Sequence, residues 1–364
     1  MTTHRSEIFA ISDEYIDTLG RMSPMSATAL GIPGYDHLLN DFSVAAESKV
    51  AHYRREVLNR VKSMEPIDDI DRIAKEVLME RIESSLQLFD SKEAFITYGP
   101  IANPVAEIRS IFTLMSTEGE DAIGSVTSRL NAVGTALESW KSTIEEMQAF
   151  GKATARRQVL GVAEQLLIHG SGGYANMARS IDPNGKFPDL HLAAQSAEAA
   201  CLSMATWMQE VHAPRSLAID GVGAERYAPW ARFFTGADLD LRDTYEWAVE
   251  DLNQINARMY KVAEKLGLTG KSLREVAQYC EEAELHRIDG EGELLAKLIS
   301  FTEEAVARVD GIYFDIDPRI KFCDARIAPD GSAAAPYYMP PSEDLSRPGT
   351  TWYPTLGHTR FNFW

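Results

Sequence analysis

Residues 314–329 read FDIDPRIKFCDARIAP, and residues 333–354 read AAAPYYMPPSEDLSRPGTTWYP. This stretch ends with GHTRFNFW at 357–364, and it decides the fold class because the helical pattern of the chain stops where it begins. Prolines, aromatic residues and arginines concentrate in it. Prolines and glycines interrupt helices and mark loops and strand ends.

Within this stretch, Ile320, Phe322 and Ala325 alternate with polar and charged residues. Alternation of this kind is typical of a half-buried strand. We therefore expect a small β appendage near residues 314–338. The sequence favours a division into a helical body over 1–313 and a strand and loop segment over 314–364.

The rest of the chain repeats apolar residues at three- and four-residue steps, the spacing of amphipathic helices. No fixed-period repeat is present. We predict a mostly all-α fold, a large multi-helix body with the small β appendage. Helices are expected at 6–19, 44–64, 68–89, 137–150, 154–168, 190–211, 241–266 and 291–309. In the third of these, the residues expected to face inward are Ile70, Ile73, Val77 and Leu78.

Two helix starts carry the spacing of a capping box, in which a Ser or Thr and a Glu three residues later bond each other's backbone N–H groups. Thr117 and Glu120 form the first pair, and Ser272 and Glu275 form the second. Pro104 is well placed to open another helix, because proline is favoured in the first turn. We expect helices to begin at all three places.

Composition limits the classes of partner. The chain has 54 acidic and 36 basic residues among 364, a formal net charge of −18. Nucleic acids and anionic membranes bind basic surfaces, so we expect neither as a partner. Three widely spaced cysteines indicate reduced thiols. Acidic residues interrupt the first apolar run, so we expect no signal peptide, and no apolar run is long enough to span a membrane. We therefore expect a cytoplasmic protein.

Two glycine-rich stretches do not fit nucleotide-binding motifs. HGSGG at 169–173 lacks the Lys-Ser/Thr pair of a P-loop and follows a helix, where that motif requires a strand. GVGAER at 221–226 begins like the dinucleotide pattern G-x-G-x-x-G, but Arg226 occupies the third glycine position. We predict no phosphate site at either stretch.

Metal candidates are few. None of the eight histidines is followed by glutamate, so the sequence contains no H-E-x-x-H motif. Glu282 and His286 lie four residues apart and could share a metal, or could form an ion pair at a helix end. Asp315 and Asp317 could bind a divalent cation from one strand face, or could lie in a turn before Pro318. We expect neither a metal site nor a catalytic residue in this chain.

The C-terminal segment holds the remaining residues of a binding type. Tyrosine hydroxyls and arginine guanidinium groups suit the recognition of peptide carbonyls and carboxylates. The candidates for substrate binding are Tyr337, Tyr338, Arg347 and Arg360. The alternative is that these side chains only pack the appendage onto the helical body.

Three separated pieces of the sequence carry further patterns. Residues 24–36 follow P-x-x-A-T-x-L-G-I-x-G-Y-D, residues 223–247 contain Gly223, Glu225 and Tyr227, and residues 335–361 contain APYY, SRPG and TRF. In order and spacing these pieces resemble the bacterial family known as domain of unknown function 885, which looks like a helical zinc metallopeptidase.

The resemblance implies a fold similar to the helical carboxypeptidases and oligopeptidases of the gluzincin type, in which two helical halves flank a peptide cleft. It implies a zinc ion held by a His-Glu motif on a helix, and a peptide substrate. That motif has no counterpart here. We therefore expect the chain to be the N-terminal portion of a zinc-dependent peptidase, ending before the zinc motif and inactive by itself. The alternative is a non-catalytic helical peptide-binding or scaffold protein.

One consequence concerns association. If part of the family's helical structure is missing, apolar surface is left exposed, and exposed apolar patches promote binding to other chains. We therefore expect self-association.

Overall fold

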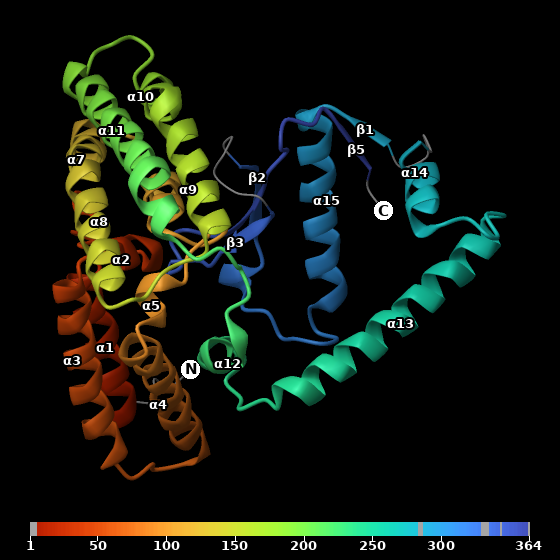
Figure 1. The fold of residues 1–364 in the computed structure, drawn as a ribbon, viewed down its shortest axis with the longest axis horizontal. Coiled ribbons are helices and arrows are strands. Elements are labelled where there is room, and N and C mark those ends of the chain that lie inside the picture. Colours follow the sequence, from red (N-terminus) through yellow and green to blue (C-terminus); the bar gives the residue numbers. More distant parts are fainter. Residues whose placement is uncertain (1–5, 283–286, 329–334, 343, 363–364) are drawn as a thin grey trace.

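A computed structural model describes residues 6–282, 287–328, 335–342 and 344–362. The fold is mostly helical with a small amount of β-structure, as the sequence predicts (Figure 1). None of the described helices is both long and apolar enough to cross a membrane. The helices are α1 (Glu7–Met22), α2 (Pro24–Leu30), α3 (Val44–Lys62), α4 (Asp69–Asp90), α5 (Glu93–Ile96), α6 (Pro104–Ile111), α7 (Glu120–Asn131), α8 (Val133–Ala149), α9 (Arg156–Ile168), α10 (Tyr174–Ile181), α11 (Pro188–Trp207), α12 (Gly223–Thr235), α13 (Leu241–Lys265), α14 (Leu273–Glu282) and α15 (Glu291–Val309).

The main core lies around α11, which packs against α7, α8, α9 and α10. Its members include Leu130, Val162, Leu166, Leu190 and Met208, all completely buried. A second core lies between α1, α3 and α4, which form the lower left part of Figure 1. Both cores use the three- and four-residue spacing read from the sequence.

The two predicted capping boxes have different outcomes. The pair Ser272 and Glu275 is confirmed: the Ser272 N–H donates to Glu275 Oε2 over 2.9 Å, and the Glu275 N–H donates to Ser272 Oγ over 3.3 Å. The capping box predicted for Thr117 and Glu120 is wrong. Gly119 caps α7 instead, with φ +91°, a conformation that favours glycine.

The expectation for the first half of α4 is wrong for three of its four residues. Ile70, Ile73 and Val77 are 60%, 52% and 57% exposed. The fourth, Leu78, is partly buried against the core between α1, α3 and α4, as expected. The fully buried apolar residues of α4 lie in its second half, where Ile82 and Leu86 pack against α1 and α3. Periodicity identifies an apolar stripe, but it does not say whether a neighbouring element covers that stripe.

The β-structure forms two small sheets. Strands β2 (Cys323–Ile327) and β4 (Gly349–Tyr353) are parallel, and β3 (Tyr337–Met339) pairs antiparallel with the other edge of β4. Strands β1 (Arg287–Asp289) and β5 (Arg360–Asn362) form an antiparallel pair. Helix α15 packs against both β1 and β2. The strands therefore reach beyond 314–338 on both sides.

The strand expected from residues 320, 322 and 325 begins later than predicted. Ala325 lies in β2 and is buried, but Ile320 lies in a 3-10 turn, Pro318–Ile320. Proline has no N–H to donate to a sheet, and its fixed φ suits a turn. The division of the chain into separate domains at residue 314 stays a prediction.

A buried arginine organises residues 24–38. Arg129 of α7 is completely buried, and its Nε donates to the Leu38 carbonyl over 2.8 Å. Its Nη2 donates to Thr28 Oγ1 over 2.9 Å and to the Tyr35 carbonyl over 3.1 Å. Thr28 in turn donates to Asp36 Oδ1 over 2.6 Å. This network fixes the turn that follows α2.

The segment after β3 contacts the same turn. The Arg347 guanidinium donates to the Ala29 carbonyl. Gly31 has φ +78°, and a Cβ placed on it would lie 2.4 Å from the Cβ of Ser342. Glycine is therefore required at position 31 both by its backbone conformation and by the close approach of Ser342. Two pieces of the family pattern, one at each end of the chain, meet at this junction.

Candidate functional site

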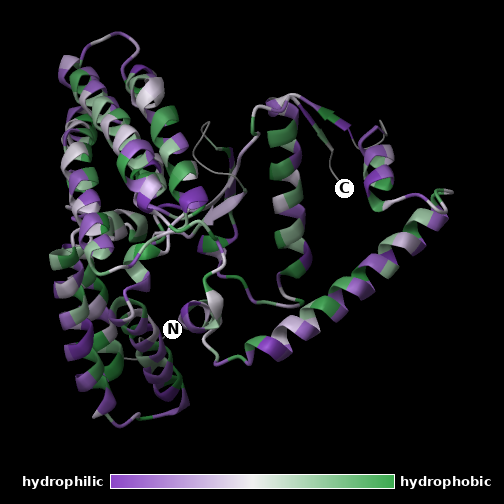
Figure 2. Cartoon of the chain, viewed as in Figure 1, coloured by the Kyte–Doolittle hydropathy of each residue, from purple (hydrophilic) through white to green (hydrophobic). Residues whose placement is uncertain are grey.

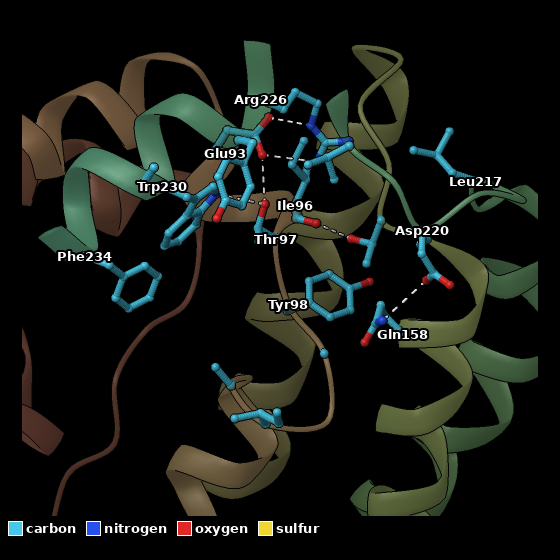
Figure 3. A pocket seen from close by; sticks show the side chains of 18 of the residues that line it. Glu93, Ile96, Thr97, Tyr98, Gln158, Leu217, Asp220, Arg226, Trp230 and Phe234 are labelled. Carbon is cyan, nitrogen blue, oxygen red and sulfur yellow. Dashed lines mark hydrogen bonds and ion pairs between the residues drawn. The ribbon is translucent and has the colours of Figure 1, made fainter. Parts of the chain in front are cut away.

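A cavity of about 730 Å³ lies beside α12 and is open to solvent (Figure 3). Its walls come from the segment 96–102, the start of α9, the segment 217–222 and α12. Most of the lining is apolar. The principal apolar side chains are Ile96, Ile101, Leu217, Ile219, Trp230 and Phe234. We call this cavity the α12 pocket. Its volume is within the range of small-ligand sites, about 300–1,000 Å³.

A buried ion pair joins α12 to α5 at one side of the pocket. Glu93 Oε1 accepts from Arg226 Nε over 2.7 Å, and Oε2 accepts from Nη2 over 3.1 Å. The side chains of Glu93 and Arg226 are 3% and 23% exposed. Two parallel hydrogen bonds fix both the position and the orientation of the guanidinium group.

Thr97 extends this network to the aromatic part of α12. Its hydroxyl donates to Glu93 Oε2 over 2.8 Å and accepts from Trp230 Nε1 over 3.2 Å. The indole ring is stacked on Phe234, with ring centroids 5.8 Å apart. Trp230 therefore bonds the wall through its polar atom and presents its apolar surface to the pocket.

Glycines at its two ends and contacts with Arg81 position α12. The helix begins at Gly223 (φ +76°), and Gly236 (φ +69°) caps its C-terminal end; both have conformations that favour glycine. On its far side Arg81 of α4 donates to the Phe233 carbonyl over 2.8 Å and lies over the Phe233 ring. α12 is thus attached to α4 on one side and to α5 on the other.

The opposite wall is held by main-chain pairing. The Leu217 N–H donates to the Thr154 carbonyl over 3.0 Å, and the Arg156 N–H donates to the Leu217 carbonyl over 2.7 Å. Further along, Asp220 accepts from Arg157 Nε over 2.6 Å and from Gln158 Nε2 over 3.3 Å. These bonds fix Leu217 and Ile219 as apolar lining.

One lining residue, Tyr98, connects the pocket to a buried chain of polar groups behind it. The Tyr98 hydroxyl lies 2.6 Å from His212 Nε2, and Gln148 Nε2 lies 2.8 Å from His212 Nδ1. An amide nitrogen can only donate, so Nδ1 accepts and Nε2–H donates to Tyr98. Burial, with a smaller contribution from Arg215, lowers the pKa of His212 to about 4. Burial also raises the pKa of Tyr98. Both groups are neutral at neutral pH.

These contacts decide what the pocket can recognise. The carboxylate of Glu93, the hydroxyl of Thr97 and the indole N–H of Trp230 already bond one another. A ligand therefore meets mainly apolar surface, including Ile219 at 74% and Phe234 at 77% exposure. Burying such surface contributes about 25 cal/mol per Å². The site suits an apolar group.

The four residues predicted to bind substrate do not line this pocket. Tyr337 and Tyr338 lie in β3, where the Tyr337 ring is stacked on Trp352 with centroids 6.3 Å apart. Arg347 bonds the Ala29 carbonyl, and burial lowers the pKa of Arg347. Arg360 lies in the other sheet, on β5, and is 3.7 Å from Asp289. Tyr337 and Tyr338 are consecutive in β3, so their side chains point to opposite faces of the strand. Strand β5, which carries Arg360, lies on the other side of α15 from β3 (Figure 1).

The described residues contain no group of three or more His, Cys, Asp and Glu side chains that could hold a metal ion. Asp317 caps the turn Pro318–Ile320, and its carboxylate accepts hydrogen bonds from the N–H and the guanidinium group of Arg319. These hydrogen bonds lower the pKa of Asp317 to about 2. Glu282 accepts from Gln278. Its proposed partner, His286, lies outside the described residues.

The pocket itself was not predicted from the sequence. In the sequence, Arg226 stands out only because it breaks a glycine motif, and its partner Glu93 lies 133 positions earlier. One signal was present: Glu225 and Tyr227, on either side of Arg226, belong to the central piece of the family pattern. Tyr227 lines the pocket.

The fold and the pocket define a mostly helical protein with an apolar cavity of ligand size. The chain belongs to the family described as "Bacterial protein of unknown function (DUF885)", whose model matches residues 24–364. The family predicted from the three sequence pieces is thereby confirmed. A search of the curated proteins finds no match.

Two solved structures have a similar fold. One is described as "the putative lipoprotein from Colwellia psychrerythraea", with 14% identity and a TM-score of 0.77 over 97% of this chain and 67% of that chain. The other is "a putative lipoprotein of unknown function from Shewanella oneidensis", with 16% identity and a TM-score of 0.61 over 96% of this chain and 64% of that chain. The chain thus spans about two thirds of the length of each relative.

Proposed function

We propose that the chain is the substrate-binding portion of a zinc-dependent peptidase, and that the α12 pocket receives an apolar side chain of a peptide. The observation that carries the proposal is the pocket itself, a solvent-open apolar cavity whose polar wall atoms bond one another. Pockets of this kind, with a few fixed polar groups and mainly apolar walls, are the usual form of ligand sites.

The described residues do not fit a zinc site, because they bring no three ligating side chains together. We therefore derive no hydrolytic step for this chain. In this proposal zinc-dependent hydrolysis belongs to a longer form of the protein, and peptide binding by these residues is independent of zinc. The net charge of −18 favours association with peptides that carry positive charge.

Peptide binding can be measured directly. A fluorescently labelled peptide with a central phenylalanine between lysines is titrated with the chain, and its anisotropy gives the dissociation constant. The matched peptide has serine in place of phenylalanine. We expect the phenylalanine peptide to bind at least about tenfold more tightly, since burying an aromatic side chain contributes about 1.5–3 kcal/mol.

A variant pair locates the site. Ile219→Glu changes a pocket residue that is 74% exposed, and Ile312→Glu makes the same change at a residue that is 72% exposed and outside the pocket. Both side chains are too exposed to be needed for folding. We expect Ile219→Glu to weaken binding about tenfold or more and Ile312→Glu to leave it unchanged. Equal binding of both peptides, or equal effects of both variants, would contradict the proposal.

The second candidate function is a non-catalytic peptide-binding or scaffold protein, which the same pocket supports. Metal analysis and a peptidase assay of the chain and of any longer form separate the two. Stoichiometric zinc and peptide cleavage in the longer form, with neither in these 364 residues, agree with the peptidase proposal. A longer form with neither property favours the scaffold. The cytoplasmic location stays a prediction, which cell fractionation would test.

A further inference from the structure

Helix α13 is the longest described helix, with 25 residues, and it is almost entirely exposed. Ala263 is its only buried residue. Among the described elements it packs mainly against α14, near its C-terminal end. Figure 1 shows α13 running away from the helical body, and Figure 2 shows hydrophobic and hydrophilic residues side by side along it. In proteins most helical stability comes from packing an apolar face, so an exposed amphipathic helix of this kind fits a partner surface.

Eight of the apolar residues between Leu241 and Leu266 follow the pattern of a coiled coil, whereas Trp247, Val249 and Tyr260 lie outside it. The spacing of these eight residues alternates strictly between four and three residues over more than three heptads, which is an average repeat of 3.5. The members of this seam are Leu241, Tyr245, Ala248, Leu252, Ile255, Met259, Val262 and Leu266. Several are half exposed or more, including Tyr245 at 70%, Leu252 at 55% and Val262 at 52%. An apolar seam with this repeat packs against the matching seam of another α-helix.

The charges of α13 are divided between its two halves. The first half contains four acidic residues and one basic residue, Asp243, Glu246, Glu250, Asp251 and Arg242. The second half contains three basic residues and one acidic residue, Arg258, Lys261, Lys265 and Glu264. A parallel copy would place like charges together, whereas an antiparallel copy would place the acidic half beside the basic half. Charged residues that flank a seam set the orientation of the partner.

We propose that α13 forms an antiparallel coiled coil with α13 of a second copy of this chain. In the register that overlaps the two helices over their full length, every seam layer is filled. Leu252 packs against Ile255 of the second copy, and Met259 packs against the smaller Ala248 of the second copy. Asp251, which flanks the seam, lies beside Arg258 of the second copy, and twofold symmetry repeats each contact.

The overall charge of the chain does not prevent this pairing. At about 0.15 M salt, charges more than about 8 Å apart are largely screened. Asp251 and Arg258, which directly precede the seam residues Leu252 and Met259, are of opposite sign across the interface. The dimer is therefore stabilised by burial of the seam and oriented by these two ion pairs.

The test uses the complete chain and measures its mass in solution by sedimentation velocity at micromolar concentrations and about 0.15 M salt. We expect a dimer. Leu252→Glu places a charge in the seam and is expected to give a monomer. Because Leu252 is 55% exposed, the fold of the chain does not depend on it, and circular dichroism verifies that the helical content is kept.

A charge exchange tests the orientation. Asp251→Arg or Arg258→Asp alone juxtaposes like charges and is expected to raise the dimer dissociation constant about tenfold. The double variant restores opposite charges and is expected to return it to the wild-type range. The control Glu250→Arg makes the same charge change on the outer face of α13 and is expected to have little effect.

Three outcomes would overturn the proposal: a wild-type monomer, a Leu252→Glu dimer, or a double variant no tighter than either single variant. The first would mean that another partner, such as a helix of a longer form of the protein, covers the seam. The last would mean that the copies pair in another orientation or at another surface.

Discussion

The buried ion pair between Glu93 and Arg226 gives the most direct test of how the α12 pocket is built. Arg226→Met keeps the length and apolar stem of the side chain and removes its charge. Glu93, with a side chain only 3% exposed, then loses both hydrogen bonds from the guanidinium group. We expect the variant to be less stable and α12 to be less firmly attached to α5.

The size of the effect follows from the surroundings of the carboxylate. Removing one partner of a buried ion pair typically costs about 3–5 kcal/mol. Thr97 still donates one hydrogen bond to Glu93, and the 23% exposure of the Arg226 side chain lets water approach from that side. Both features reduce the cost, so we expect a loss of about 3 kcal/mol in the free energy of unfolding.

Urea unfolding followed by circular dichroism measures this loss. The control is Arg232→Met in the same helix, because Arg232 pairs with Asp238, whose side chain is 82% exposed. Exposed pairs contribute about 0–1 kcal/mol, so the control should change little. Adding Glu93→Gln to Arg226→Met should recover at least about 1 kcal/mol, since it removes the unpaired charge. A loss below about 0.5 kcal/mol for Arg226→Met would refute the reasoning.

Two further predictions concern pH and packing. Burial lowers the folded-state pKa of His169 and His212 to about 4, so between the usual value of 6.5 and pH 4 the unfolded chain binds protons that the folded chain does not. The free energy of unfolding should therefore be highest above pH 6.5 and fall by about 3 kcal/mol per histidine towards pH 4. Urea unfolding over this pH range measures the change, and a constant free energy of unfolding would contradict the prediction. Gly31→Ala should cost about 2 kcal/mol or more, because a Cβ there meets Ser342 and the backbone has positive φ. Gly34→Ala, with φ +94° and nothing within 4 Å, should cost only about 1 kcal/mol in the same assay.

Local signals predicted the helices well. The last expected helix, 291–309, coincides with α15, and 241–266 differs from α13 by one residue. Periodicity and capping residues act within a few positions of the chain, so a sequence contains them completely. The errors arose where a second element decides the outcome, as for Ile73 and Val77, which form an apolar stripe on α4 that is left exposed.

Local sequence patterns could not predict the pocket, because its walls come from segments that are far apart in the sequence. Glu93 and Arg226 each look like ordinary helix residues, and only the folded chain brings them within 2.7 Å. The candidate residues Tyr337, Tyr338, Arg347 and Arg360 stay a prediction for substrate binding. Arg347 donates a hydrogen bond to the Ala29 carbonyl, a contact that agrees with the alternative role of packing the appendage onto the helical body.

The junction between the two ends of the chain has a consequence for biosynthesis. Arg347 and Ala29 are 318 residues apart, so at a synthesis rate of about 5–20 residues per second they leave the ribosome roughly 16–64 s apart. Thr28 and Arg129 are only 101 residues apart, so the turn can be fixed by Arg129 long before Arg347 exists. The contact of Arg347 with Ala29 can therefore close on a segment that Arg129 already holds in place. A substitution at Arg347 should accordingly speed unfolding far more than it slows folding.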